Sequence, residues 1–162
     1  MVAVTTLGGT SLGRYLAGLL TGLNDLRPLM EDIGFNMKEN TRLRLSEGVD
    51  IYGEEFQTSF RASDEGGQTL IDTGLLRNSI DYLATKKSIE WGVTKAIPYA
   101  WILNAGGIIK PKKKKFLRFK LGGVWQFRKF VVMPERRFIG LSNEDQQMLL
   151  DLVYSFLSQS GA

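Results

Sequence analysis

Two adjacent glycines at positions 122–123 constrain the fold of this sequence more than any other feature. They separate FLRFKL from VWQFRKFVV, two stretches rich in aromatic and branched residues. A two-residue glycine turn between such stretches predicts a tight antiparallel hairpin, and it fixes which residues lie opposite each other. One face of the hairpin then alternates cations with aromatic rings. The pairs expected on that face are Lys120 with Trp125, Arg118 with Phe127, and Phe116 with Lys129.

The same region holds much of the positive charge. The chain has 21 basic and 17 acidic residues, a formal net charge of +4. Residues 110–137 contain 11 of the basic residues and one acidic residue, so this segment carries +10 and the remainder carries −6. This asymmetry predicts one positive surface for an anionic partner, either DNA phosphate or an acidic face of another subunit. The candidate contact residues are Lys110, Lys112, Lys113, Lys114, Lys115, Arg118, Lys120, Trp125, Arg128 and Lys129.

The composition excludes several kinds of chemistry. The chain has no cysteine and no histidine, which removes thiolate nucleophiles, imidazole bases, disulfides and the commonest zinc ligands. The acidic pairs at 54–55 and 64–65 lack metal-ligand spacing and are interpreted as a solvated acidic loop. The sequence has no phosphate-binding loop and no dinucleotide fingerprint, and a serine nucleophile would need a lysine as its base. We therefore expect no catalytic, metal or cofactor site, and no enzyme.

The N-terminal region predicts a soluble, unprocessed protein. Its first residues, MVAVTTLGGT, have no basic segment, and the apolar run LAGLLTGL is far shorter than the roughly 20 residues that span a bilayer. The absence of cysteine fits a reducing cytosol.

Two stripes of apolar residues at helical spacing follow. The first covers residues 11–23, with a serine as its candidate N-cap. The second starts at Asn24 or Asp25 and continues toward Leu43 or Leu45, and the pattern fits one kinked helix or two helices. The stripes consist of Leu12, Tyr15, Leu16, Leu19, Leu20 and Leu23, and of Leu26, Met30, Ile33 and Met37.

The central region predicts one loop, one helical turn and one hairpin. Residues 47–67 have poor periodicity and end in a Ser/Asp/Gly cluster, which is typical of an exposed loop. Thr73 is expected to cap a helical turn over residues 74–78. Alternating apolar residues in 80–84 and 89–93 predict a hairpin that turns at two lysines.

The C-terminal half adds two helices around the glycine-turn hairpin. A short helix is expected after Pro98, ending at Gly106-Gly107. Ser142 and Asp145 have the spacing of a capping box and open a last helix. The chain is therefore expected to be a single α+β domain with helices packed on an antiparallel sheet. Its parts are N-terminal helices over 1–46, a sheet over 70–142 with a projecting hairpin at about 110–132, and a C-terminal helix over 143–159.

Three separated segments carry a family resemblance. They are LIDTGLLRNSI at 70–80, Pro98-Tyr99-Ala100 followed by Gly106-Gly107, and PERRFIGLSNED at 134–145. Their order and spacing over roughly residues 70–158 resemble those of the phage virion morphogenesis family, the tail completion proteins of Mu-like phages and their distant relatives in long-tailed phages. The chain departs from the family pattern at Trp101-Ile102-Leu103-Asn104, where relatives often carry His or Gln, and at Pro-Glu-Arg-Arg, where "PAR" is usual.

The resemblance implies a structural virion protein at the head-proximal tail end or neck, present in the host cytoplasm during assembly. It implies a ring, of six copies, that joins the tail to the head connector. The implied partners are other copies of the chain, neck, connector and tail tube or terminator proteins, and genomic DNA in the ring lumen, with no membrane contact. The alternative from a different class is a DNA-binding module that uses the basic hairpin 110–129.

Several interpretations of the basic hairpin compete. The lysines are a solvated loop, or they meet phosphates in a ring lumen, or they face an acidic ring of a neck or tube protein. We rank subunit docking first because clean nucleic-acid motifs are absent from the sequence. The aromatic residues are interpreted as packing within the hairpin rather than as stacking platforms for bases. The expected interface anchors outside the hairpin are Tyr99, Trp101, Arg136, Arg137 and Phe138.

Overall fold

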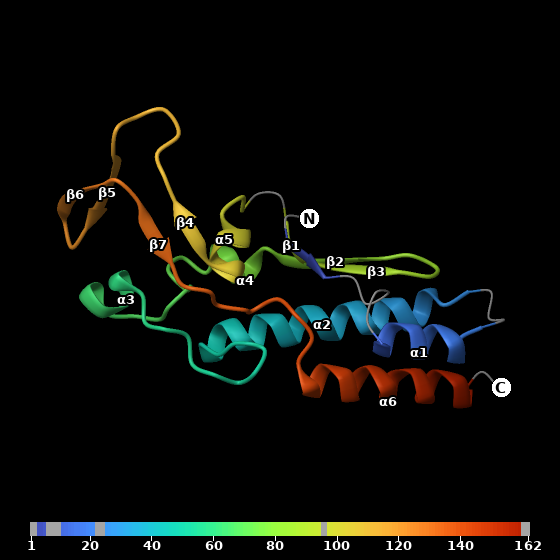
Figure 1. Ribbon diagram of the computed structural model, residues 1–162. Coiled ribbons are helices and arrows are strands. Elements are labelled where there is room, and N and C mark those ends of the chain that lie inside the picture. Colours follow the sequence, from blue (N-terminus) through green and yellow to red (C-terminus); the bar gives the residue numbers. More distant parts are fainter. Residues whose placement is uncertain (1–2, 6–10, 22–24, 95–96, 160–162) are drawn as a thin grey trace.

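The computed structural model describes residues 3–5, 11–21, 25–94 and 97–159. These residues form a layered body from which an arm projects (Figure 1). Helix α2 (Arg27–Glu47) lies in the middle of the body, between a small sheet and helix α6 (Asn143–Gln159). Helix α1 (Ser11–Leu19) packs beside α6. The arrangement confirms the predicted α+β class and the C-terminal helix.

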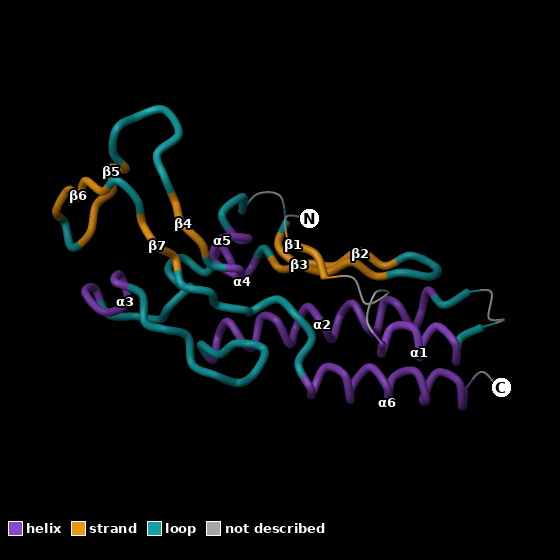
Figure 2. Tube along the Cα trace, in the orientation of Figure 1, coloured by secondary structure: helices purple, strands orange, loops and turns teal. Residues whose placement is uncertain are grey.

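The body sheet has three antiparallel strands in the order β1-β3-β2. Strands β2 (Ile80–Ala84) and β3 (Ile89–Val93) form the predicted hairpin, and β1 (Ala3–Thr5) pairs with the other edge of β3. The remaining strands form two separate ribbons rather than part of one sheet over 70–142, as Figure 2 shows in orange. Helix α2 packs on the three-stranded sheet through β2 and β3.

Two apolar clusters hold the body together. The first lies between α2, the sheet and α6, around the fully buried Met37, Trp91 and Leu149. The second lies at the C-terminal end of α2, around Leu45 and Phe138. Burying side chains of this size stabilises the fold by about 1.5–3 kcal/mol each. The predicted stripe of α2 is confirmed, because Leu26, Met30, Ile33 and Met37 are all buried.

The N-terminal region forms two helices. Helix α1 begins at Ser11 itself, and Leu23 and Asn24 lie outside the described residues. Helix α2 begins at Arg27, whose backbone N–H donates to the Asp25 carboxylate at 3.0 Å. The left-handed Gly48 ends it, and its N–H returns to the Arg44 carbonyl.

The segment 47–67, predicted as an exposed loop, is mostly exposed but contains regular structure. The segment contains helix α3 (Phe60–Glu65), and the hydroxyl of Ser59 caps it by accepting from the Ala62 N–H at 3.2 Å. It also contains a bridge between Val49 and Glu55, and Phe56 is buried in the second cluster. A helix of this length is too short to show a periodic pattern, so the sequence could not reveal it.

The helical turn after residue 73 forms, but Thr73 does not cap it. Helix α4 (Leu75–Asn78) has Gly74 at its N-cap position, with φ of 74°, and no side chain caps its first turn. A left-handed backbone at this position favours glycine over threonine. Helix α5 (Ala100–Ala105) forms as predicted and ends at Gly106.

The capping box at the start of α6 is confirmed. The Ser142 N–H donates to Oδ2 of Asp145 at 2.9 Å, and the Asp145 N–H donates to the Ser142 hydroxyl at 3.1 Å. Asp145 is also fully buried and forms an ion pair with Arg44 of α2. The same carboxylate therefore begins α6 and ties it to α2.

Gly106 lies where two backbone segments cross, which leads to a stability prediction. Its φ is 67°, and a Cβ atom there would lie 2.7 Å from the backbone nitrogen of Glu135 and 3.0 Å from the Met133 carbonyl oxygen. We expect Gly106→Ala to lower the free energy of unfolding by about 2–4 kcal/mol, because backbone strain and overpacking add. Urea denaturation measures the change in the free energy of unfolding.

The matched control is Gly53→Ala. Gly53 also has a left-handed φ, of 80°, but a Cβ atom there would have no neighbour within 4 Å. This variant isolates the cost of a left-handed backbone at a residue with a Cβ atom. It should lower the free energy of unfolding by about 1 kcal/mol. Equal losses for the two variants would contradict the role given to the crossing.

Candidate functional site

The candidate site is the arm, defined here as residues 107–133. It consists of two antiparallel ribbons in series (Figures 1 and 2). Strands β4 (Gly107–Ile109) and β7 (Val131–Met133) form the base, and β5 (Leu117–Leu121) and β6 (Val124–Arg128) form the tip. The register of the tip ribbon is the predicted one, with Lys120 opposite Trp125 and Arg118 opposite Phe127. The base ribbon was not predicted.

The two ribbons are joined asymmetrically. Residues 110–116 connect β4 to β5, whereas Lys129 and Phe130 alone connect β6 to β7. The longer connection is the lysine loop, which contains Lys110 and Lys112–Lys115 and is the highest segment in Figure 1. Like charges repel and Pro111 has no N–H to donate to a strand ladder, so this segment is unsuited to pairing.

The cation and aromatic face of the tip is confirmed. The Arg118 guanidinium lies 3.9 Å from the centre of the Trp125 ring, and the Lys120 ammonium lies 5.9 Å from it. Lys115 lies 5.9 Å from the centre of the Phe116 ring. Each such contact contributes about 0.5–1 kcal/mol at an exposed site. The contacts stiffen the hairpin, and they occupy one face of Trp125 with a cation of the same chain.

The arm exposes apolar surface as well as charge. Ile108 and Val132 lie opposite each other on the base ribbon, and both are exposed. Trp125, Phe127 and Phe130 are also exposed, each by half or more of its surface. An isolated two-stranded ribbon is only marginally stable in water. Exposed aromatic rings beside positive charges are typical of a surface that another molecule covers.

Among the described residues, the arm cations form no ion pair with an acidic side chain. The ion pairs over the described ranges involve Lys38, Arg42, Arg44, Arg61 and Arg137, and none involves an arm residue. Nine uncompensated cations therefore project on one element. Such an element attracts an anionic partner through a field that salt screens.

The segment after the arm is anchored on α5. The backbone N–H of Arg136 donates to the Asn104 carbonyl at 3.2 Å, and the Ile139 N–H donates to the Asn104 side-chain oxygen at 2.9 Å. Asn104 is one of the residues at which the chain departs from the family pattern, and here it holds the segment that follows β7.

The five expected anchors outside the hairpin divide into two groups. Phe138 is 0% exposed and Arg136 is 4% exposed, so neither presents a surface to another subunit. The Arg136 guanidinium donates from Nε and Nη2 to the Gln57 carbonyl at 3.1 and 2.9 Å, and burial lowers its pKa from the ordinary arginine value. These two residues are a correction to the expected interface, because their side chains complete contacts inside the chain. Tyr99 and Trp101 are exposed, as is Arg137.

Arg137 has partners within its own chain. Its Nε donates to the Glu135 carboxylate, and its Nη1 donates to the Tyr52 hydroxyl at 3.0 Å. The hydrogen bond to Glu135 is the main reason why the pKa of Arg137 is raised. Exposed pairs of this kind contribute little to stability, because solvent screens them.

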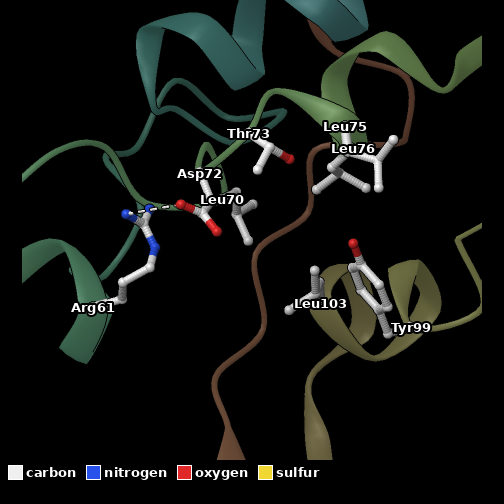
Figure 3. A pocket seen from close by; sticks show the side chains of 8 residues that line it. All are labelled: Arg61, Leu70, Asp72, Thr73, Leu75, Leu76, Tyr99 and Leu103. Carbon is white, nitrogen blue, oxygen red and sulfur yellow. Dashed lines mark ion pairs between the residues drawn. The ribbon is translucent and has the colours of Figure 1, made fainter. Parts of the chain in front are cut away.

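Two of the family segments meet at a pocket of about 210 Å³ (Figure 3). Leu75 and Leu76 of α4 face Tyr99 and Leu103 across it, and Arg61 and Asp72 form an ion pair of 3.7 Å at its edge. The remaining lining residues are Leu70 and Thr73. Sequence reasoning noted these segments as a resemblance but did not predict that they line one pocket.

The described part of the chain contains no group of three or more acidic residues placed to hold a metal ion. Over the same ranges, none of the helices is both long and apolar enough to cross a bilayer.

Comparison with known proteins identifies the family. A search of curated proteins and a search of solved structures gave no match. A family model matches residues 8–158, nearly the whole chain, and its description is the phage virion morphogenesis family. The match includes the arm, the pocket and both long helices. The chain therefore belongs to the phage virion morphogenesis family and has a structural or assembly role in the virion.

Proposed function

We propose that the chain is a tail completion or neck protein, which forms a ring of six copies and joins the tail to the head connector. The observation that carries this proposal is the arm, which projects beyond the packed body with uncompensated cations and exposed aromatic rings. A ring subunit needs a rigid body and an element that reaches its neighbours. Its partners are other copies of the chain and the adjacent neck, connector, tube or terminator proteins.

Protein docking explains the arm better than DNA binding does. A DNA-binding ribbon would use Trp125 and neighbouring aromatic rings as stacking platforms for bases. Here the Arg118 guanidinium already covers one face of Trp125. Non-specific contact of the lysine loop with genomic DNA in the ring lumen is compatible with the same ring. The proposed role involves no bond-making step.

Imaging of the purified particle tests this proposal. We expect reconstruction by electron cryomicroscopy to place the chain in a closed ring at the junction of tail and head, with the arm in contact with an adjacent subunit. Gold labelling of a tagged chain provides an independent location. Absence of the chain from finished particles, or one copy per particle, would contradict the proposal.

DNA affinity provides a second measurement. Fluorescence anisotropy of the purified chain with duplex DNA at several salt concentrations should show weak binding. Tight binding that falls steeply with salt would favour the DNA-binding alternative, because each neutralised phosphate releases counterions.

A further inference from the structure

We infer that the arm of one copy binds the acidic surface of the neighbouring copy in the ring. The acidic surface is defined as residues 47–72, which carry seven acidic residues and one arginine, a net charge of −6. The arm carries nine basic residues and no acidic residue. The inference rests on the proposed ring and specifies which surfaces adjacent subunits use. The acidic residues are Glu47, Asp50, Glu54, Glu55, Asp64, Glu65 and Asp72.

The negative charge of the chain is concentrated on this surface. Residues outside 47–72 and 110–137 have equal numbers of basic and acidic residues, so the two segments account for the whole charge asymmetry. Within the described ranges Asp72 pairs with Arg61, and the other six carboxylates of the surface form no ion pair. Both surfaces are thus left uncompensated inside one chain. Pairing them between chains removes like-charge repulsion within each.

The acidic surface also exposes aromatic rings. Phe60 on α3 is 80% exposed and Tyr52 is 67% exposed. The arm exposes Trp125, Phe127 and Phe130. Aromatic residues are enriched at the centre of protein interfaces and charged residues at their rims. The two surfaces therefore match in apolar character as well as in charge.

The arm of a chain does not neutralise the acidic surface of that same chain. The turn of the tip does approach α3, because a Cβ atom on Gly122 would collide with the Asp64 carboxylate. The lysine loop, however, joins the base ribbon to the tip ribbon and lies at the top of Figure 1, away from α3. The contact within the chain is made by the turn, and no arm cation forms an ion pair with a carboxylate of the described residues.

The two surfaces are different parts of the molecule, so the contact is head-to-tail. A heterologous contact of this type generates a ring when its rotation closes. One arm and one acidic surface per subunit are the two different surfaces that such a contact requires.

Disulfide trapping in purified particles tests the inference directly, because the natural chain has no cysteine. We would place Lys114→Cys and Glu55→Cys on the same chain and oxidise the particles mildly. The expected result is a ladder of chain multiples on a non-reducing gel. The matched control is Lys87→Cys with Glu55→Cys, which moves one thiol to the exposed β2-β3 turn and should leave the chain monomeric.

Charge reversal tests the electrostatic part. We would reverse the arm with Lys113→Glu and Lys114→Glu, and in a second variant reverse the acidic surface with Glu54→Lys and Glu55→Lys. Each double variant should lower particle assembly more than about tenfold, because several like-charge contacts cost more than 1.4 kcal/mol. Co-production of the two reversed chains should restore assembly, since each arm then meets a complementary neighbour. Two control variants change the charge by the same amount outside both surfaces. They are Lys86→Glu with Lys87→Glu, and Glu90→Lys with Asp151→Lys, and they should have little effect on particle assembly.

The outcomes separate this inference from the ring itself. A disulfide confined to one chain would overturn the arm contact. The contact would also be overturned if charge reversal on the arm abolished assembly while charge reversal on the acidic surface did not. Either result would point to another partner for the arm, DNA included. Lysine-reactive cross-linking of unmodified particles reports the ring independently. Chain multiples in that experiment without the disulfide ladder would refute the arm contact and keep the ring, whereas monomers in both would refute the ring.

Discussion

Asp145→Ala is expected to lower the free energy of unfolding by about 3–5 kcal/mol, the usual cost of removing one partner of a buried ion pair. Asp145 is 1% exposed. Its Oδ1 accepts from the Asn40 amide at 2.8 Å, and its Oδ2 accepts from the Arg44 guanidinium and from the Ser142 N–H. Thermal or urea unfolding followed by circular dichroism measures the loss.

The expected loss is large because Arg44 cannot escape to solvent. Its guanidinium also donates to the carbonyls of Phe138 and Gly140 at 3.2 and 3.3 Å, so it is held under the chain that leads into α6. Without Asp145 a buried cation keeps only carbonyl partners. A loss of this size is a major part of the total stability of a domain, about 5–15 kcal/mol.

Two variants separate the charge from the side chain. Asp145→Asn keeps a side-chain oxygen as an acceptor for the capping contact but removes the charge, so we expect an intermediate loss. Asp151→Ala changes an exposed aspartate on the same helix, which accepts only from Gln147 in the described hydrogen bonds, and should change stability by less than about 0.5 kcal/mol. A loss below about 1 kcal/mol for Asp145→Ala would contradict the role of the buried pair.

Deletion of residues 112–128 is expected to abolish the joining of heads and tails while the body stays folded. Ile109 lies opposite Val131 in the base ribbon, so the deletion leaves Lys110, Pro111, Lys129 and Phe130 as a short loop between paired strands. Loops of this length are common in hairpins. None of the deleted residues belongs to either apolar cluster.

Two measurements check the deletion. Circular dichroism should show an unfolding temperature close to that of the full chain, because the core is untouched. Electron microscopy of infected cells should show separate heads and tails, with infectivity near that of a phage that lacks the gene. Replacement of Lys86 and Lys87 with glutamine is the surface control. Normal infectious particles from the deletion would rule out the arm as the joining element.

Most of the elements could be predicted because their signals are local. The glycine turn specified the tip register, the Ser142 and Asp145 spacing specified the start of α6, and the alternation around Trp91 specified the body hairpin. Each depends on residues a few positions apart, whose backbone conformations and hydrogen bonds are coupled directly.

The features that could not be predicted from the sequence have a common cause. The base ribbon joins Gly107–Ile109 to Val131–Met133, strands too short to show a pattern and far apart in the sequence. Phe138 and Arg136 sit in a segment whose composition suits a surface as well as a core, and the fold buries both. Their burial depends on α5 and Gln57, which no local pattern connects with them.

The sequence by itself determined the turn, the cation and aromatic face of the tip, the start of α6 at its capping box and the uneven distribution of charge. Only the tertiary structure decided that the lysines lie on a projecting loop without acidic partners in the described chain, and that two of the family segments line one pocket. The physical reason is that turns and caps are formed by neighbours in the sequence. Exposure and pairing of charge depend on which distant segments the packed core brings together.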